Sequence, residues 1–142
     1  MIEEKLYFED LEIGRAVESP GRTLTEPDAV RYIGLTGEWE EWTPDEGGAR
    51  QVPNLLTLCA SGGLGWRVPQ PPLAILAFMG LEWQFLQPLR IGDTVRNRSW
   101  TLAKRAVKDG GVVVEQREIL NQRGEVVQSG RLTFLVARHP ES

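Results

Sequence analysis

The chain has 142 residues, 41% apolar and 25% charged, a composition typical of a globular protein with one domain. One cysteine, Cys59, and one histidine, His139, exclude an internal disulfide and Cys/His zinc sites, and they argue against Ser-His-Asp or Cys-His catalysis. The net charge of −4 divides into 13 acidic and 4 basic residues in positions 1–48, against 7 acidic and 12 basic residues in positions 49–142. We therefore expect one cytoplasmic domain over 1–142, without metal, cofactor, nucleic-acid partner or membrane segment.

The first elements are a short extended segment with a turn at 7–14 and a helix that begins after Thr25. Thr25 and Asp28 have the spacing of a capping box, and Pro27 suits a first turn that needs no donor at that position. Apolar residues at helical spacing continue for about three turns. Gly37 is expected to end this helix.

The segment 38–53 is predicted to be irregular, and a second helix is predicted to follow it. Asn54 is a suitable cap for the apolar stretch 55–66. This stretch is apolar on all sides, which predicts a helix that is buried rather than amphipathic. Cys59 lies within it, and inert packing is the expected role of its thiol.

The remainder has the pattern of long antiparallel strands. The predicted strands are Leu73–Met79, Leu81–Leu89, Thr94–Ala106, Val112–Leu120 and Val126–Ala137, with turns at 108–111 and 121–124. In the last strand Leu132, Phe134 and Val136 share one face. Phe78, Trp83 and Phe85 are expected in the core of the sheet. The predicted fold class is α+β, with an antiparallel sheet wrapped around the buried central helix.

Residues 32–43, YIGLTGEWEEWT, followed by Ala49, resemble a family motif. The motif is that of the MaoC-like dehydratase and (R)-specific enoyl-CoA hydratase family, and it reads Tyr/Phe, a short spacer, Leu-Ser/Thr-Gly-Asp-x-Asn-Pro-Ile-His. In this chain Glu38 replaces the catalytic Asp, Glu40 replaces the Asn and Thr43 replaces the catalytic His. The frame of the motif is kept, whereas its catalytic pair is replaced.

Four further segments are similar to the same family in the same order. They are Tyr7–Gly14, Arg22–Asp28, Phe85–Thr94 and Asn121–Gly130. Together with the motif they extend the resemblance over nearly the whole chain. The resemblance implies a hotdog fold.

The family acts on enoyl or 3-hydroxyacyl thioesters of coenzyme A or acyl carrier protein, in fatty acid metabolism. The resemblance therefore implies an acyl thioester as ligand. It implies that Glu38 acts as acid/base, that the backbone N–H of Asn54 polarises the thioester carbonyl, and that Thr43 binds water or ligand.

Two further pairs of residues are candidates for substrate binding. Trp39 and Trp42 line the acyl tunnel in one interpretation and anchor an irregular loop in the other. Arg96 and Arg98 belong to a basic stretch that suits a phosphorylated ligand, or else forms a solvated strand face.

Three functions stay open at this point. The chain is a divergent hydratase or dehydratase, a non-catalytic subunit that pairs with an active MaoC-like partner, or a thioesterase that uses Glu38, Glu40 or Glu41 as a lone carboxylate. The resemblance also implies a homodimer, or a heterodimer with another hotdog chain, because such domains join their sheets side by side.

Overall fold

The computed structural model describes residues 4–38, 48 and 50–140. In chain order the elements are η1 (Phe8–Asp10), β1 (Val17–Glu18), β2 (Arg22–Thr23), α1 (Glu26–Thr36), α2 (Asn54–Leu64), η2 (Gly65–Arg67), β3 (Ile75–Phe85), β4 (Thr94–Val107), β5 (Gly110–Leu120) and β6 (Val126–Val136). The predicted extended opening is wrong at its centre, because 8–10 forms a short 3-10 helix.

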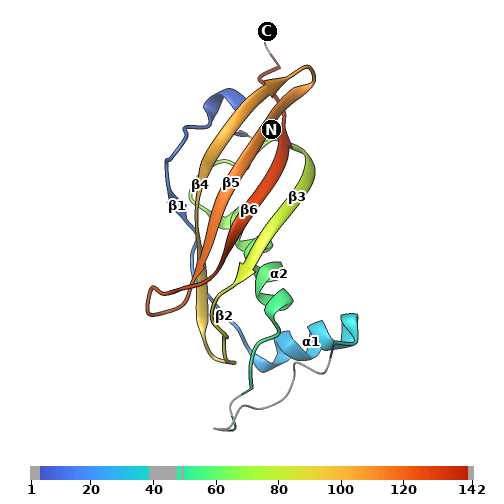
Figure 1. The fold of residues 1–142 in the computed structure, drawn as a ribbon, viewed down its shortest axis with the longest axis vertical. Helices are drawn as coiled ribbons and strands as arrows, with labels where there is room; N and C mark the ends of the chain where they lie inside the picture. Colours follow the sequence, from blue (N-terminus) through green and yellow to red (C-terminus); the bar gives the residue numbers. More distant parts are fainter. Residues whose placement is uncertain (1–3, 39–47, 49, 141–142) are drawn as a thin grey trace.

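The strands form one antiparallel sheet in the order β1-β4-β5-β6-β3, and β2 also pairs with β4. Figure 1 shows this sheet curving around α2, with α1 at the lower end of the view, and the end of β6 at the upper end. The two strands predicted on either side of Gly80 are one strand, β3, with a register irregularity between Phe78 and Gly80. The predicted α+β architecture, an antiparallel sheet wrapped around a central helix, is confirmed.

Helix α1 begins and ends where the sequence predicts. The Thr25 Oγ1 accepts a hydrogen bond from the Asp28 N–H at 3.4 Å, and Asp28 Oδ2 accepts one from the Thr25 N–H at 2.9 Å, so the capping box is formed. Gly37 ends the helix with a φ of 77°, a left-handed conformation that glycine adopts without steric cost.

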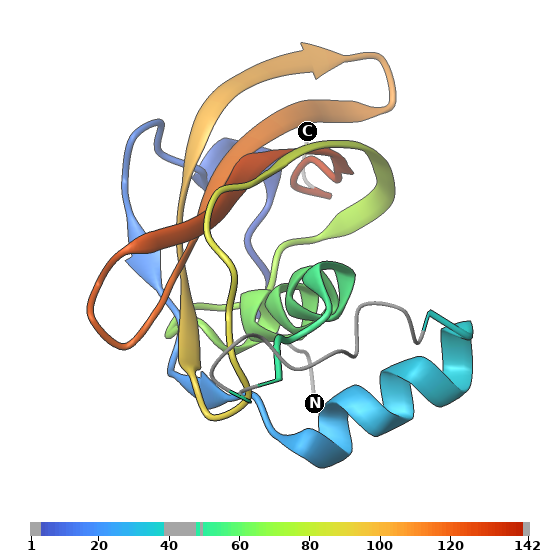
Figure 2. The same cartoon turned by 60° about the horizontal axis from the view of Figure 1, so that its bottom comes forward.

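Helix α2 differs from its prediction at its start and on its outer face. It begins at Asn54 after Pro53, which occupies the capping position, so the prediction of Asn54 as the cap is wrong. The helix buries Thr57 and Ser61 against the sheet. Its opposite face leaves Leu55 and Cys59 exposed, so neither burial on all sides nor inert packing of the thiol is found. The reason is that the sheet covers only one face of α2 (Figure 2).

The core lies between α2 and the concave face of the sheet. Its largest cluster of buried side chains consists of Leu24, Val52, Leu64, Leu89, Val95, Ile119 and Val127. A second cluster contains Leu132, Phe134 and Val136, which confirms the face predicted for the last strand.

Strand β3 is the edge of the sheet, and it is less buried than predicted. Phe78 is 58% exposed and Phe85 is 44% exposed, so their assignment to the core is wrong. Trp83 is half-buried, and its Nε1 donates a hydrogen bond to Gln128 Oε1 at 2.9 Å. An edge strand has a neighbour on one side only, which leaves its large side chains uncovered within this chain.

Candidate functional site

The carboxylate of Glu38 is held by a residue of the preceding helix. The Tyr32 hydroxyl donates a hydrogen bond to Glu38 Oε2 at 2.5 Å, and the Glu38 N–H donates one to Thr36 Oγ1 at 3.2 Å. Tyr32 is only 8% exposed, whereas Glu38 is exposed. The left-handed Gly37 turns the chain at the end of α1, and the carboxylate six residues after Tyr32 thus returns to that hydroxyl. The result is a solvent-accessible carboxylate with one oxygen oriented by a buried phenol.

The other candidates of the motif lie outside the described residues. These are Trp39, Glu40, Glu41, Trp42 and Thr43. Their roles stay predictions.

Asn54 occupies the first turn of α2. Its carbonyl accepts a hydrogen bond from Gln128 Nε2 at 3.3 Å, and Gln128 is buried in the sheet. This contact ties the start of the helix to β6. The first N–H groups of a helix point away from its body, and the helix dipole makes this end positive. The first turn of α2 is therefore a suitable place for the backbone N–H donor that the sequence predicts at Asn54.

Arg96 and Arg98 lie on the face of β4 that points away from α2. Successive side chains of a strand point to opposite faces of the sheet. The buried Val95, Asn97 and Ser99 point inward, so Arg96 and Arg98 point outward. Arg96 pairs with Glu18 at 2.8 Å, and Arg98 pairs with Glu118 at 2.6 Å. The structure does not bring these arginines together with Glu38, and their charges are balanced on the outer surface.

A groove between α1 and α2 adjoins the candidate carboxylate. It has a volume of about 460 Å³, and the partner of Glu38, Tyr32, lines it. Among the described residues, three arginines line it against one carboxylate: Arg22, Arg31 and Arg67 against Asp28, which pairs with Arg22 at 2.8 Å. The described lining therefore carries more positive than negative charge over an apolar floor from the exposed face of α2.

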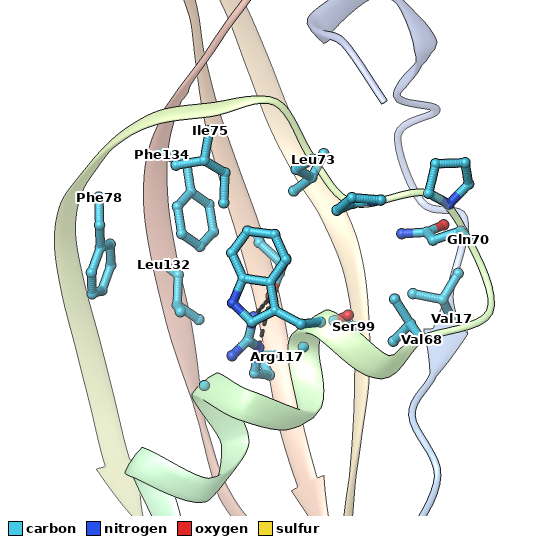
Figure 3. A pocket seen from close by; sticks show the side chains of 16 residues that line it. Val17, Val68, Gln70, Leu73, Ile75, Phe78, Ser99, Arg117, Leu132 and Phe134 are labelled. Atoms are coloured by element: carbon cyan, nitrogen blue, oxygen red, sulfur yellow. Dashed lines mark hydrogen bonds and ion pairs between the residues drawn. The ribbon is translucent and has the colours of Figure 1, made fainter. Parts of the chain in front are cut away.

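A second cavity of about 280 Å³ lies between the far end of α2 and the sheet. Its apolar lining includes Trp66, Leu73, Ile75, Phe78, Leu132 and Phe134. In Figure 3 Phe78 and Phe134 lie on one side of the cavity, Val17 lies on the other, and Arg117 lies at its base beside the helix. The cavity was not predicted.

The base of this cavity holds a buried ion pair. Arg117 and Glu115 are joined by contacts of 2.7 Å from Nε and 2.6 Å from Nη2 to the same carboxylate oxygen, and their side chains are 7% and 14% exposed. The alternation of inward and outward residues along β5 could have predicted this pair, because Glu115 and Arg117 lie on the same inward face as Val113 and Ile119.

A polar network connects the ion pair to α2 and β4. Arg117 Nη1 donates to the Ser61 carbonyl at 3.3 Å, and Asn97 Nδ2 donates to the same carbonyl at 2.8 Å. Ser61 Oγ donates to Asn97 Oδ1 at 2.8 Å. Both Ser61 and Asn97 are buried. These bonds hold the guanidinium in one position under the helix.

The single histidine of the chain is engaged elsewhere. His139 Nε2 lies 2.9 Å from Asp10 Oδ1, and its ring centroid lies 4.6 Å from that of Tyr7. The Tyr7 N–H and then His139 hold the pKa of Asp10 below its usual range by hydrogen bonding to the carboxylate. His139 therefore contacts the N-terminal segment, through Asp10 and Tyr7.

Neither a metal cluster nor a membrane span is found within 4–38, 48 and 50–140. No three His, Cys, Asp or Glu side chains of these residues come together as metal ligands. No helix among them is long and apolar enough to cross a membrane.

The sequence matches no family model. Protein MaoC of Klebsiella aerogenes is a curated relative, 31% identical over 110 residues, which cover 72% of this chain and 32% of the relative. The chain therefore spans about a third of the length of that relative.

Two solved structures cover nearly the whole chain. A monoamine oxidase regulatory protein from Archaeoglobus fulgidus has a TM-score of 0.85 and 28% identity, over 96% of this chain and 97% of its own. A MaoC-like dehydratase from Rhodospirillum rubrum has a TM-score of 0.82 and 27% identity, over 95% and 99%. These similarities confirm the resemblance found in the sequence. The chain therefore has the hotdog fold of the MaoC-like dehydratases.

Proposed function

We propose that this protein binds an acyl thioester and that Glu38 is the acid/base for hydration of its α,β-double bond. The observation that carries the proposal is the 2.5 Å hydrogen bond from the buried Tyr32 to Glu38, at the groove between α1 and α2. It orients one carboxylate oxygen and leaves the other for water. The fold of the MaoC-like dehydratases supports the choice of reaction.

The proposed reaction needs one carboxylate and one oxyanion donor. Glu38 takes a proton from water while the water oxygen bonds to the β-carbon, and the electrons of the double bond move into the thioester as an enolate. The enolate then collapses as the α-carbon takes the proton that Glu38 removed from the water, and the carboxylate of Glu38 is restored. The backbone N–H of Asn54, at the positive end of α2, is the proposed donor to the enolate oxygen. Thr43 is proposed to hydrogen-bond the water.

The ligand is proposed to run from the groove between α1 and α2 to the cavity between the far end of α2 and the sheet. The apolar cavity at the far end of the helix takes the acyl tail, with Trp39 and Trp42 as further proposed contacts of the ligand. Arg31 and Arg67 of the groove suit the phosphates of a carrier, because the part of the groove lined by described residues holds more positive than negative groups. They suit this role better than Arg96 and Arg98, whose charges are balanced by carboxylates.

The test is the loss of conjugated-thioester absorbance with a short trans-2-enoyl-CoA. We expect decay with the wild type, and a rate at least about a hundredfold lower with Glu38→Gln. Tyr32→Phe should lower the rate about tenfold, because it removes one hydrogen bond to a charged group. Glu26→Gln, an exposed acid in the first turn of α1, is the matched control and should not change the rate.

Two results would contradict the hydratase proposal. Release of free thiol without loss of the alkene would indicate the thioesterase with a lone carboxylate instead. Equal rates for wild type and Glu38→Gln would show that Glu38 does not transfer the proton.

A second candidate function is that of a non-catalytic subunit beside an active MaoC-like chain. The observation in its favour is that His139, the one histidine, is bound to Asp10 away from Glu38. Strand β3 supplies a surface for pairing, because it is a sheet edge that exposes large apolar side chains. These are Leu76, Phe78, Met79, Leu81 and Phe85.

Co-expression with a chain that carries the full Asp…His motif tests this second function. We expect a stable heterodimer whose activity on the enoyl thioester exceeds that of either chain alone, measured by light scattering and the same absorbance assay. A homodimer of this chain that is active by itself would contradict it.

A further inference from the structure

The cavity at the far end of α2 has one feature that an alkyl chain does not require. Its walls are mostly aromatic and aliphatic, with Gln70 and Ser99 as polar members, yet its base is formed by the charged side chains of Arg117 and Glu115. Arg117 is 6% exposed, and removal of a charge from water costs several kcal/mol unless partners replace the water. The cavity therefore presents a buried guanidinium and a half-buried carboxylate to whatever enters it.

The hydrogen bonds of the pair leave some of its polar atoms without a partner among the described residues. A guanidinium has five N–H groups. Within the described residues, Nε and one N–H of Nη2 meet Glu115 Oε2, and Nη1 meets Ser61. The second N–H of Nη2 and the other carboxylate oxygen, Oε1 of Glu115, have no partner in the part of the chain that the structure describes. A donor and an acceptor therefore lie together on two side chains that line the cavity.

This combination selects a particular chemical group. A hydroxyl both accepts and donates, so it satisfies the Arg117 N–H and the Glu115 oxygen at once. A carboxylate would accept from Arg117 but would lie against the Glu115 carboxylate, where repulsion is strong because little water is present. A methyl end would leave both polar groups without a partner.

We infer that this cavity selects acyl chains that carry an uncharged hydroxyl group beyond the reacting carbons. The inference rests on the proposed function, because it takes this cavity as the place of the acyl tail. A volume of about 280 Å³ equals that of about nine water molecules at about 30 Å³ each, which leaves room for a chain of about six carbons.

Gly65 keeps the space that the guanidinium needs. A Cβ at this position would lie 3.1 Å from Arg117 Nη2, closer than ordinary contacts allow. The backbone at Gly65 has a φ of −59°, so alanine fits the backbone and only displaces the guanidinium. Gly65→Ala therefore changes the position of the pair without removing either charge.

The experiment is calorimetric titration with three pantetheine thioesters, hexanoyl, 6-hydroxyhexanoyl and 5-carboxypentanoyl. Pantetheine has no phosphate, so the arginines of the other groove do not dominate binding. We expect the hydroxylated probe to bind about tenfold more tightly than the hexanoyl probe, and the carboxylated probe to bind most weakly. The double variant Arg117→Leu/Glu115→Leu should lose this preference and still bind the hexanoyl probe.

Two further variants make the result specific. Gly65→Ala should reduce the preference for the hydroxyl, and it keeps the test valid if the double variant does not fold. The control is Arg123→Leu/Glu125→Leu, which removes a 2.7 Å ion pair from the exposed turn between β5 and β6 and should leave the preference unchanged.

The outcomes separate this inference from the proposed function. Equal binding of the hexanoyl and hydroxylated probes by the wild type would overturn the inference and leave acyl binding intact. An unchanged preference in a folded double variant would also overturn it. Binding of none of the three probes would overturn both the inference and the acyl cavity.

Discussion

The two candidate sites differ in how their polar groups are held. Just beyond the end of α1, Glu38 is held by Tyr32, six residues earlier in the chain, and it faces solvent. At the C-terminal end of α2, Arg117 is held by Ser61, 56 residues away in the chain, and it is buried. The first arrangement needs one helix and one turn, whereas the second needs the assembled sheet. We therefore expect substitutions at the second site to lower the free energy of unfolding more than substitutions at the first.

The largest effect on stability is expected from Arg117→Leu. This change leaves the Glu115 carboxylate, 14% exposed, without its counter-ion, which costs about 3 kcal/mol of the free energy of unfolding. The double change with Glu115→Leu should cost within about 1 kcal/mol, because two apolar side chains replace the pair. Urea unfolding measures both. Equal losses of stability for the single and double variants would show that an unpaired charge is not the cause of the loss.

A smaller loss is expected from Asn97→Ala. Asn97 exchanges two hydrogen bonds of 2.8 Å with Ser61, and its removal leaves the buried Ser61 hydroxyl without that acceptor. The expected cost is about 1–3 kcal/mol. A double-mutant cycle with Ser61→Ala separates this pair from general packing. Strict additivity of the two single changes would contradict a direct coupling of β4 to the helix.

A smaller loss of stability is expected from Thr25→Ala, at the start of α1. The change removes the capping hydrogen bond to the Asp28 N–H and should cost about 1 kcal/mol. Thr25→Ser keeps the hydroxyl and should restore most of the loss. Thermal unfolding by circular dichroism checks both variants. A loss for Thr25→Ala as large as that for Arg117→Leu would remove the contrast between local and long-range contacts.

The smallest effect is a dependence of stability on acid pH. The His139 N–H lowers the pKa of Glu9 from its ordinary 4.5, and the Tyr7 N–H lowers that of Asp10 from its ordinary 3.8. A lowered pKa in the folded state stabilises the protein above the unfolded value and ceases to do so as pH falls through the folded value. The free energy of unfolding should therefore decline as pH falls below about 4.5.

Urea unfolding at a series of pH values tests this decline. Asp10→Asn should make it shallower, and Glu12→Gln, a neighbouring exposed acid, should leave it unchanged. A decline of the same slope in Asp10→Asn would assign the acid sensitivity to other carboxylates.

Local sequence signals predicted the elements whose limits depend on few residues. Thr25, Asp28 and Gly37 mark the limits of α1 because capping and a left-handed turn are short-range effects. The alternation of Leu132, Phe134 and Val136 predicted the buried face of β6 for the same reason. The motif at 32–43 also led to Glu38, whose partner Tyr32 lies within that motif.

The failures arise where a neighbour distant in the chain decides the outcome. Phe78 and Phe85 have the apolar character of core residues, yet they are exposed because β3 has a partner strand on one side only. Leu55 and Cys59 are exposed because the sheet covers one face of α2. The hydrophobicity of a residue does not predict whether another element covers it in the folded protein.

By itself, the sequence determined the capped helix and the strand pattern, and it predicted the frame of the hydratase motif with Thr43 in place of its histidine. Only the tertiary structure placed Arg96 and Arg98 on the outer face, and brought Glu115 and Arg117 under Ser61. The physical reason is the separation along the chain over which each interaction acts. Caps, turns and alternation act over a few residues, whereas burial of a charge becomes favourable only when the sheet has closed around its partners.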